Sequence, residues 1–318
     1  MATCWFVGLT TLDVVHRAAG RPGADQKVTA SRQDVAAGGP AANAAVTAAA
    51  LGVRAVLVTA LGDSPVARAA RADLEACGVE VHDVVEPGTR FPLAVSAVLV
   101  DDATGERSVV SADAALAAAP APTFLDDLPT PDVVLLDGHH PAVARAVVAH
   151  LAAVTPRPRV VLDAGRWRPL FADLLPHADV AAPSADFTVP AEALGGVAPT
   201  GTSVGGGGAT GPGHPDPTAA AVQALGARAV VVTHGGDPVT WTAADGTDGT
   251  VDVPRVAVRD TLGAGDAFHG ALAAALAGTG PGGVPGDALR AAVTAAVRVA
   301  SARVTHVGPR SWLAEVSP

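Results

Sequence analysis

The chain of 318 residues is long enough for one large α/β domain or two medium-sized ones. Hydrophobic residues make up 49% of it but aromatic residues only 3%, so the core has to be packed with alanine, valine and leucine. The net charge of −10 argues against a nucleic-acid partner, whose phosphates require a basic surface. No uncharged run is bulky enough to span a membrane and the N-terminus lacks a signal-peptide pattern, so we expect a cytoplasmic protein.

Lysine usage excludes two large classes of phosphate-transferring enzyme. Only one of the 21 basic residues, Lys27, is a lysine. A Walker-type P-loop needs a lysine inside its glycine-rich loop, and a protein kinase needs one on an early strand beside such a loop. Neither pattern is present, so phosphoryl transfer by this chain would require a different scaffold.

Short apolar runs alternate with helical patterns along most of the chain. The predicted strands are Thr3–Leu9, Leu12–His16, Lys27–Val35, Ala55–Ala60, Glu80–Val84, Pro92–Asp101, Glu106–Ser111, Val133–Leu136, Arg159–Asp163, Val180–Ala182, Ala229–Thr233, Val239–Thr242 and Gly249–Val253. The predicted helices are an alanine-rich one from the Gly38–Asn43 segment to Leu51, Pro65–Cys77, Pro141–Val154, Thr218–Leu225, Ala267–Leu276 and Asp287–Arg303. This rhythm predicts a mostly parallel sheet with helices on both faces.

Two regions interrupt the α/β rhythm. Alternating strands at about 12–36 and 90–112 predict a small β flap, inserted in two pieces into a single domain that spans residues 1–318. Residues 195–217 are rich in glycine, threonine and proline and are predicted to form a flexible surface loop.

The segment Asp260–Asp266 (DTLGAGD) carries the strongest chemical signal. It reads as a glycine-rich turn that opens a helix, where free N–H groups and the helix dipole favour an anion such as phosphate. A carboxylate at such a site, Asp266, would repel phosphate unless it has a task, and the obvious task is to accept a proton from an attacking hydroxyl. Taken alone, the segment is equally compatible with an ordinary helix N-terminus stabilised by an acidic residue.

A second signal lies near the start of the chain. Gly38 and Gly39 would let a ligand approach the backbone, and Asn43 falls in the first turns of the following helix, where its amide suits a polyhydroxylated ligand. Asp13 comes just after the end of the first strand, where α/β sheets hold their ligands. Read without further context, Asp13 and Asn43 are also compatible with surface roles.

Together, Gly38–Asn43 and Asp260–Asp266 resemble the two signatures of the ribokinase (PfkB-type) family of sugar kinases, and the resemblance covers essentially the whole chain. It implies a three-layer α/β sandwich with a small β lid over the sugar, ATP and Mg²⁺ as cofactors, and dimers formed through the lid. The implied roles are a catalytic base at Asp266, an anion hole at Gly263, Ala264 and Gly265, sugar contacts from Asp13, Gly38, Gly39 and Asn43, and nucleotide contacts from Thr233, Gly235, Asp260 and Thr261. In several members the position of Asp260 binds K⁺ or structures the loop.

Several positions depart from the family pattern or narrow it. Within the family, the closest resemblance is to sulfofructose kinase and ketohexokinase-like members, although Ser111 and His139 stand where sulfofructose kinase has Asn and Arg for its sulfonate. Lys27 at the lid could pair with an acidic group of the substrate or be an ordinary solvated lysine. Asp186 stands in place of the glutamate that supports Mg²⁺, as hard oxygen ligands of either length suit this ion.

The preferred hypothesis is therefore an ATP-dependent kinase acting on a hydroxyl of a small sugar or sugar-like acid. A nucleoside kinase of the same fold is the first alternative, although the lid contains a single aromatic residue, Phe91. A dinucleotide-dependent oxidoreductase would explain Gly263–Gly265, but the third glycine of its fingerprint is replaced by Phe268. The third alternative is a sugar-binding protein without catalysis.

Overall fold

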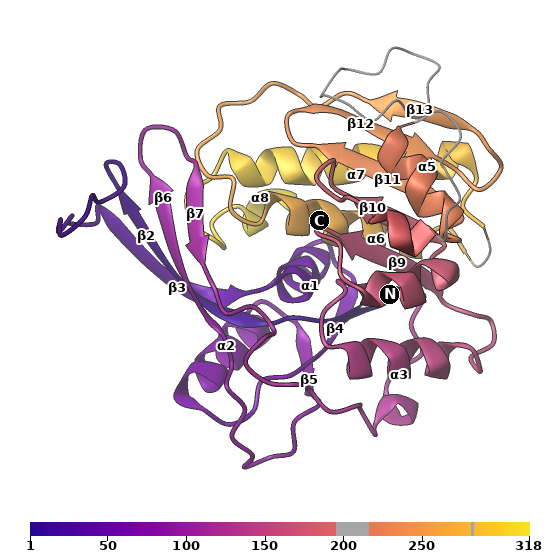
Figure 1. Ribbon diagram of the computed structural model, residues 1–318, viewed down its shortest axis with the longest axis horizontal. Coiled ribbons are helices and arrows are strands. Elements are labelled where there is room, and N and C mark those ends of the chain that lie inside the picture. The colour runs from indigo at the N-terminus through magenta and orange to yellow at the C-terminus, as the bar shows by residue number, and fades with distance from the viewer. Residues whose placement is uncertain (195–215, 281–282) are drawn as a thin grey trace.

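The computed structural model describes residues 1–194, 216–280 and 283–318. A nine-stranded sheet with helices on both faces forms a three-layer α/β sandwich, and a separate four-stranded sheet projects from one side of it (Figure 1). The predicted fold class is confirmed. The predicted loop at residues 195–217 lies almost entirely outside the described residues.

The large sheet has the order β13-β12-β11-β10-β9-β8-β1-β4-β5 and is parallel from β5 through β11. Its strands are β1 (Thr3–Val7), β4 (Arg54–Thr59), β5 (Glu80–Asp83), β8 (Val133–Leu136), β9 (Arg159–Ala164), β10 (Val180–Pro183), β11 (Val230–His234), β12 (Asp237–Thr242) and β13 (Asp248–Val251). The last two form an antiparallel hairpin at one edge. Because the other strands are parallel, their carboxyl ends share one edge of the sheet, where α/β folds place ligands.

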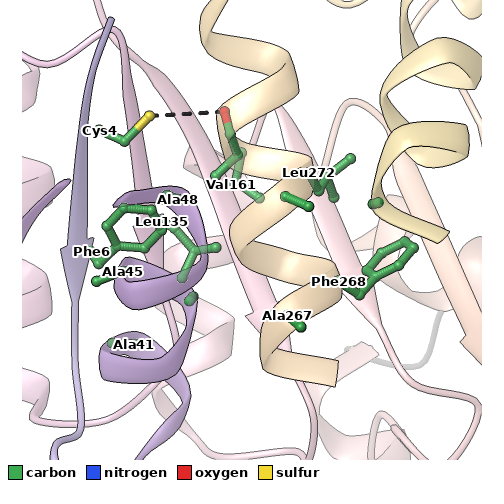
Figure 2. Packing of buried hydrophobic residues seen from close by; sticks show 14 of the residues in the cluster. Cys4, Phe6, Ala41, Ala45, Ala48, Leu135, Val161, Ala267, Phe268 and Leu272 are labelled. Carbon is green, nitrogen blue, oxygen red and sulfur yellow. Dashed lines mark hydrogen bonds between the residues drawn. The ribbon is translucent and has the colours of Figure 1, made fainter. Parts of the chain in front are cut away.

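Each face of this sheet packs against its own group of helices. The first group is α1 (Pro40–Ala50), α2 (Pro65–Ala76), α6 (Ala264–Ala277) and α7 (Gly286–Val304), and the second is α3 (Pro141–Leu151), α4 (Leu170–Leu174) and α5 (Pro217–Ala224). Figure 2 shows the first face, where Phe6 and Leu135 of the sheet meet the alanines of α1, and Cys4 lies 3.9 Å from the carbonyl of Ala273 on α6. The small side chains expected from the composition therefore allow close packing.

Helices α1 and α6 approach each other with no room for an additional methyl group. A Cβ on Gly270 of α6 would collide with the carbonyl oxygen of Ala44 and the side chain of Thr47, both on α1. A glycine inside a helix costs about 1 kcal/mol relative to alanine. Here it allows two helices that carry predicted site residues, Asn43 and Asp266, to pack backbone against backbone.

The small sheet has the order β3-β2-β6-β7, from β2 (Thr11–Ala18), β3 (Arg32–Gly38), β6 (Val95–Asp101) and β7 (Arg107–Val110). Its strands come from the two regions predicted to form a flap, at about 12–36 and 90–112. Several valines on it are exposed: Val35, Val95, Val109 and Val110. That this sheet acts as a lid stays a prediction.

Three expectations about single elements were wrong. Helix α6 begins at Ala264, three residues before the predicted Ala267, because Gly263 adopts the left-handed conformation at its N-cap. Of the predicted strand Lys27–Val35, only the part from Arg32 is paired, since the register with β2 ends at Arg17 and Arg32. The helices α4 and α8 (Leu313–Val316) were not predicted, and both are too short to show a helical period.

Candidate active site

Asp266 lies in the first turn of α6, beside the side chain of Asn43 on α1. The Asn43 amide donates a hydrogen bond of 2.8 Å from its Nδ2 to Oδ2 of the carboxylate. The two residues are 223 positions apart in the chain, and the close packing of α1 on α6 brings them together. The structure therefore places the most conspicuous residues of the two sequence motifs in direct contact.

The pKa of Asp266 is raised to about 6. Burial is the largest cause, followed by the negative charge of Asp163, while the hydrogen bond from Asn43 lowers the pKa in the opposite direction. A carboxylate with this pKa is ionised at neutral pH and still a better proton acceptor than an ordinary aspartate. This is the property that a general base requires.

Asn43 is fixed from its other side by Arg310, near the C-terminus. Nη1 of Arg310 donates to the Asn43 carbonyl oxygen at 3.2 Å, so the amide nitrogen is directed to Asp266. Arg310 is itself held by Asp73 on α2 at 2.7 Å and by the carbonyl of Ala37 at 2.7 Å. A continuous set of hydrogen bonds thus orients the partner of the carboxylate.

A buried ion pair lies one turn along α6 from Asp266. Nδ1 of His269 is 3.1 Å from Oδ2 of Asp163, at the end of β9, and Nε2 faces the carbonyl of Ala182 at 3.0 Å. Burial alone would lower the pKa of His269, but Asp163 outweighs it, so the pKa is raised. Asp163 therefore favours the charged form of His269, and the positive charge of His269 lowers the pKa of Asp266, opposing the effect of the Asp163 carboxylate.

The backbone at the start of α6 has free space beside it, next to the Asp266 carboxylate. A Cβ on Gly263 would lie 3.7 Å from Oδ2 of Asp266 and 3.8 Å from Nδ2 of Asn43, and one on Gly265 would enter empty space. The N–H of Ala264 already donates to the carbonyl of Thr261 at 3.3 Å. Of the three predicted anion-hole donors, Gly263 and Gly265 are therefore the ones whose N–H groups are available in this conformation.

The structure also brings the predicted sugar-binding residues to this place. Asp13, Asn43 and Gly263 line one cleft together with Leu262 and Arg310. Asp13 lies on β2, and its Oδ1 accepts a hydrogen bond of 2.7 Å from the Thr11 hydroxyl. The cleft therefore combines a carboxylate, an amide and a guanidinium, which suit a ligand with several hydroxyl groups.

The two early glycines meet structural requirements at the same cleft. A Cβ on Gly38 would collide with the Asp13 carboxylate, and a Cβ on Gly39, which has a φ of 97°, would collide with the carbonyl of Leu9. Lys27 is not brought to the site: it is exposed in the loop between β2 and β3 and does not line the cleft. Its contact with an acidic substrate group stays a prediction.

Two of the predicted nucleotide residues, Thr233 and Gly235, and the predicted metal residue Asp186 lie at the carboxyl ends of β10 and β11. Gly235 adopts a φ of 65° in the turn after β11, with open space beside it, and the carbonyl of Thr233 accepts from Ala185, next to Asp186. Asp186 is exposed, and within the described segments no cluster of three or more His, Cys, Asp or Glu could hold a metal. A single accessible carboxylate fits Mg²⁺ that is held mainly by nucleotide phosphates.

Asp260 and Thr261 make contacts within the protein, and their contact with the nucleotide stays a prediction. Asp260 is 1% exposed and its carboxylate is enclosed by the protein. Thr261 is half-buried and receives Arg107 of β7, whose Nη1 lies 3.2 Å from its carbonyl and 3.1 Å from its hydroxyl. Both residues therefore organise the loop before α6, and Thr261 links this loop to β7 of the small sheet.

A further ionic cluster connects the segment after the small sheet to the core. His139 lies between Asp137 (3.0 Å from Nδ1) and Asp113 (2.9 Å from Nε2), and Arg168 bonds Asp113 at 2.8 Å. Burial lowers the pKa of His139, but the two carboxylates outweigh it and raise the pKa to about 9. Asp137 also accepts the N–H of Leu9 and of Ala41 at the start of α1, so the cluster anchors the cleft.

Sequence reasoning missed several of these residues. His269 is three positions after Asp266 and on the same helix face, which is a usable signal. The contacts of Arg310, Asp163 and Arg107 join segments far apart in the chain, so spacing gave no indication of them.

Three known proteins illustrate the likeness of the chain. Ribokinase from Bacillus subtilis (strain 168) is 27% identical over 312 residues, or 96% of this chain and 94% of that protein. ATP-dependent ribose-1-phosphate kinase from Halopiger xanaduensis is 36% identical over 165 residues, or 50% of this chain and 53% of that protein. The structure of Arabidopsis thaliana ribokinase complexed with ribose and ATP has a TM-score of 0.67 at 22% identity, with 99% of each chain covered.

The fold is that of the ribokinase-like kinases, a class of small-molecule phosphotransferases. The family model described as pfkB family carbohydrate kinase matches residues 1–315. The chain belongs to this family, and it is a phosphotransferase that acts on a sugar hydroxyl. No helix in the described ranges is both long and apolar enough to cross a membrane.

Proposed function

We propose that the protein transfers the γ-phosphoryl group of ATP to a hydroxyl of a small carbohydrate, with Asp266 as the catalytic base. The observation that carries this proposal is the position of Asp266: a carboxylate with a pKa raised to about 6, at the open N-terminus of α6, hydrogen-bonded to Asn43, which lines the cleft together with Asp13. The cleft would hold the sugar, and Asp266 would take the proton as the hydroxyl attacks.

The backbone before and within the first turn of α6 would bind the transferred phosphoryl group. Gly263 and Gly265 offer N–H groups and no side chain above them, and the helix dipole adds positive potential. Such preorganised donors stabilise charge that develops in the transition state. Mg²⁺, supported by Asp186, would neutralise the phosphates when it is bound.

ATP as the donor and a ribose-type sugar as the acceptor are supported by the relatives. The Arabidopsis ribokinase structure contains ribose and ATP, and the Halopiger enzyme is named as an ATP-dependent ribose-1-phosphate kinase. Thr233, Gly235 and Asp186 lie together at the carboxyl ends of neighbouring strands, which suits a nucleotide. A screen of pentoses, hexoses, ketoses, sugar acids and nucleosides with ATP would identify the acceptor and test the nucleoside alternative.

We also propose that the small sheet is a lid and that two copies of the chain pair through it. The exposed valines Val35, Val95 and Val110, on β3, β6 and β7, support this, because the strand pairing puts them on one face of the small sheet and exposed apolar side chains on one face can mark an interaction surface.

Replacement Asp266→Asn tests the catalytic assignment. We expect kcat to fall by about 10² or more while sugar and ATP still bind, since the amide cannot accept the proton. The folded variant should be slightly more stable than the wild type at pH 8, because an ionised Asp266 with a raised pKa costs stability above pH 6.

Binding by calorimetry and melting temperature are the controls for this variant. Unchanged turnover would refute Asp266 as the base. Loss of sugar binding together with turnover would instead make its role one of substrate recognition.

A further inference from the structure

The loop that leads into α6 is fastened by one buried carboxylate. Asp260 is 1% exposed, and it accepts the N–H of Leu262 at 3.0 Å and the N–H of Gly308 at 3.2 Å. These bonds tie the start of the anion-binding loop to the turn after α7. A buried carboxylate needs compensating positive charge, since burial of an unpaired ion is very unfavourable.

Two buried arginines supply that charge from different parts of the fold. Nη2 of Arg303, on α7, is 3.5 Å from Oδ2 of Asp260, and Nη1 of Arg17, on β2 of the small sheet, is 3.7 Å from the same oxygen. The side chains are only 2% and 7% exposed. Arg17 also bonds Asp102 and the carbonyl of Arg259, while Arg303 bonds the carbonyl of His306.

These surroundings do not fit a monovalent cation at Asp260. The family resemblance implied K⁺ at this position in several members, where a cation would balance the carboxylate. Here one carboxylate oxygen already faces two guanidinium groups, whose facing nitrogens are buried and have no hydrogen-bond partner within the described residues. A K⁺ ion bound there would lie beside two buried positive charges that already face the carboxylate, and like charges at such distances repel.

We propose that Arg303 and Arg17 stand in for the monovalent cation, so that this kinase assembles its anion-binding loop without K⁺. Asp260 still holds the loop through its hydrogen bonds to Leu262 and Gly308, and the compensating positive charge comes from arginine side chains of the protein. Arg17 belongs to β2 of the small sheet, so its ion pair with Asp260 connects the loop to that sheet. This inference rests on the proposed kinase function for its activity readout, but not for its stability readout.

The first experiment compares K⁺, Na⁺ and tetramethylammonium chlorides at equal ionic strength, by melting temperature and by phosphorylation of the sugar found in the screen. An effector that is coupled to a second site typically changes the affinity of that site by about 5-fold or more, and we take the same factor as the threshold for activation by K⁺. We expect the wild-type rate to change less than this, and the melting temperature to be the same in the three salts. A larger activation by K⁺, or a melting temperature that rises with K⁺ alone, would overturn the proposal.

The second experiment removes one guanidinium. Arg303→Met should lower the melting temperature and make it depend on K⁺, because a bound cation now stabilises the folded state by mass action. Arg298→Met, an exposed position on the same helix, is the matched control and should stay indifferent to K⁺. A folded Arg303→Met variant that ignores K⁺ would contradict the stand-in role.

Failure of this inference differs from failure of the proposed function. The melting temperatures need no sugar and no turnover, so they report on the cation even if the phosphate acceptor is not found. If Arg303→Met does not fold, Arg17→Met replaces it, since that side chain joins Asp260 from the small sheet. The wild-type salt comparison requires neither variant.

Discussion

The hydrogen bond from Asn43 to Asp266 offers a quantitative test of the site. It is 2.8 Å long and lowers the pKa of a carboxylate that burial and Asp163 raise to about 6. A hydrogen bond to a charged group contributes about 1.5–3 kcal/mol, and 1.36 kcal/mol corresponds to one pKa unit. Because Asp266 is partly exposed, we take the lower end, so Asn43→Ala should raise the midpoint of the acid limb of kcat by about one pH unit.

The sign follows from the proposed role of Asp266 as a base, which must be deprotonated to act. Wild-type kcat should fall as pH decreases through about 6. At pH 7 about 90% of wild-type Asp266 is ionised, whereas a midpoint of about 7 leaves about half in the Asn43→Ala variant. The measurement is kcat between about pH 5 and pH 9 at saturating sugar and ATP, which separates this effect from weaker sugar binding.

Asn43→Asp is the matched variant of the same size. Arg310 would keep the new carboxylate ionised, and two carboxylates at this distance disfavour a second charge, so the midpoint should rise further than in Asn43→Ala. The expected order of midpoints is Asn, Ala, Asp. A midpoint in Asn43→Ala that equals or lies below that of the wild type would refute the assigned contact or the assigned base.

Two further changes test the anion-binding backbone and the proposed dimer. Gly265→Leu should raise the KM for ATP without lowering the melting temperature, because the side chain enters open space at the start of α6 and leucine favours a helix; an unchanged KM would place the phosphates elsewhere. Val110→Glu should convert a dimer to a monomer, since Val110 is 75% exposed on β7 of the small sheet. Light scattering at matched concentrations measures the mass, and a dimer that survives this change would argue against pairing through the sheet.

The sequence was most informative where local chemistry determines structure. The strand Val133–Leu136 has its predicted bounds because it is an apolar run closed by polar and glycine residues. Asn43 lies in the first turns of α1 as expected, because two glycines and Pro40 mark the start of that helix. The start of α6 was misplaced because a left-handed Gly263 can serve as an N-cap, which the sequence alone does not distinguish from a longer turn.

The remainder of the candidate site depends on contacts between distant segments. Arg310 and Asn43 are 267 positions apart, and their hydrogen bond exists only because the C-terminal segment folds over α1. Asp260 was expected to touch the nucleotide or a cation, but the burial of its carboxylate depends on Arg303 and Arg17 from two other elements. Such charge compensation is a property of the assembled fold and leaves no periodic pattern.

The glycine at the crossing of α1 and α6, Gly270, has a consequence for the candidate site. Because a Cβ at Gly270 has no room, the close packing of α1 on α6 sets the distance between Asn43 and Asp266, the proposed proton acceptor. If Asp266 is the base, it could activate a water molecule as readily as a sugar hydroxyl. On this proposal, exclusion of water from the bound ATP would depend on the loop before α6, whose Thr261 is contacted by Arg107 of the small sheet.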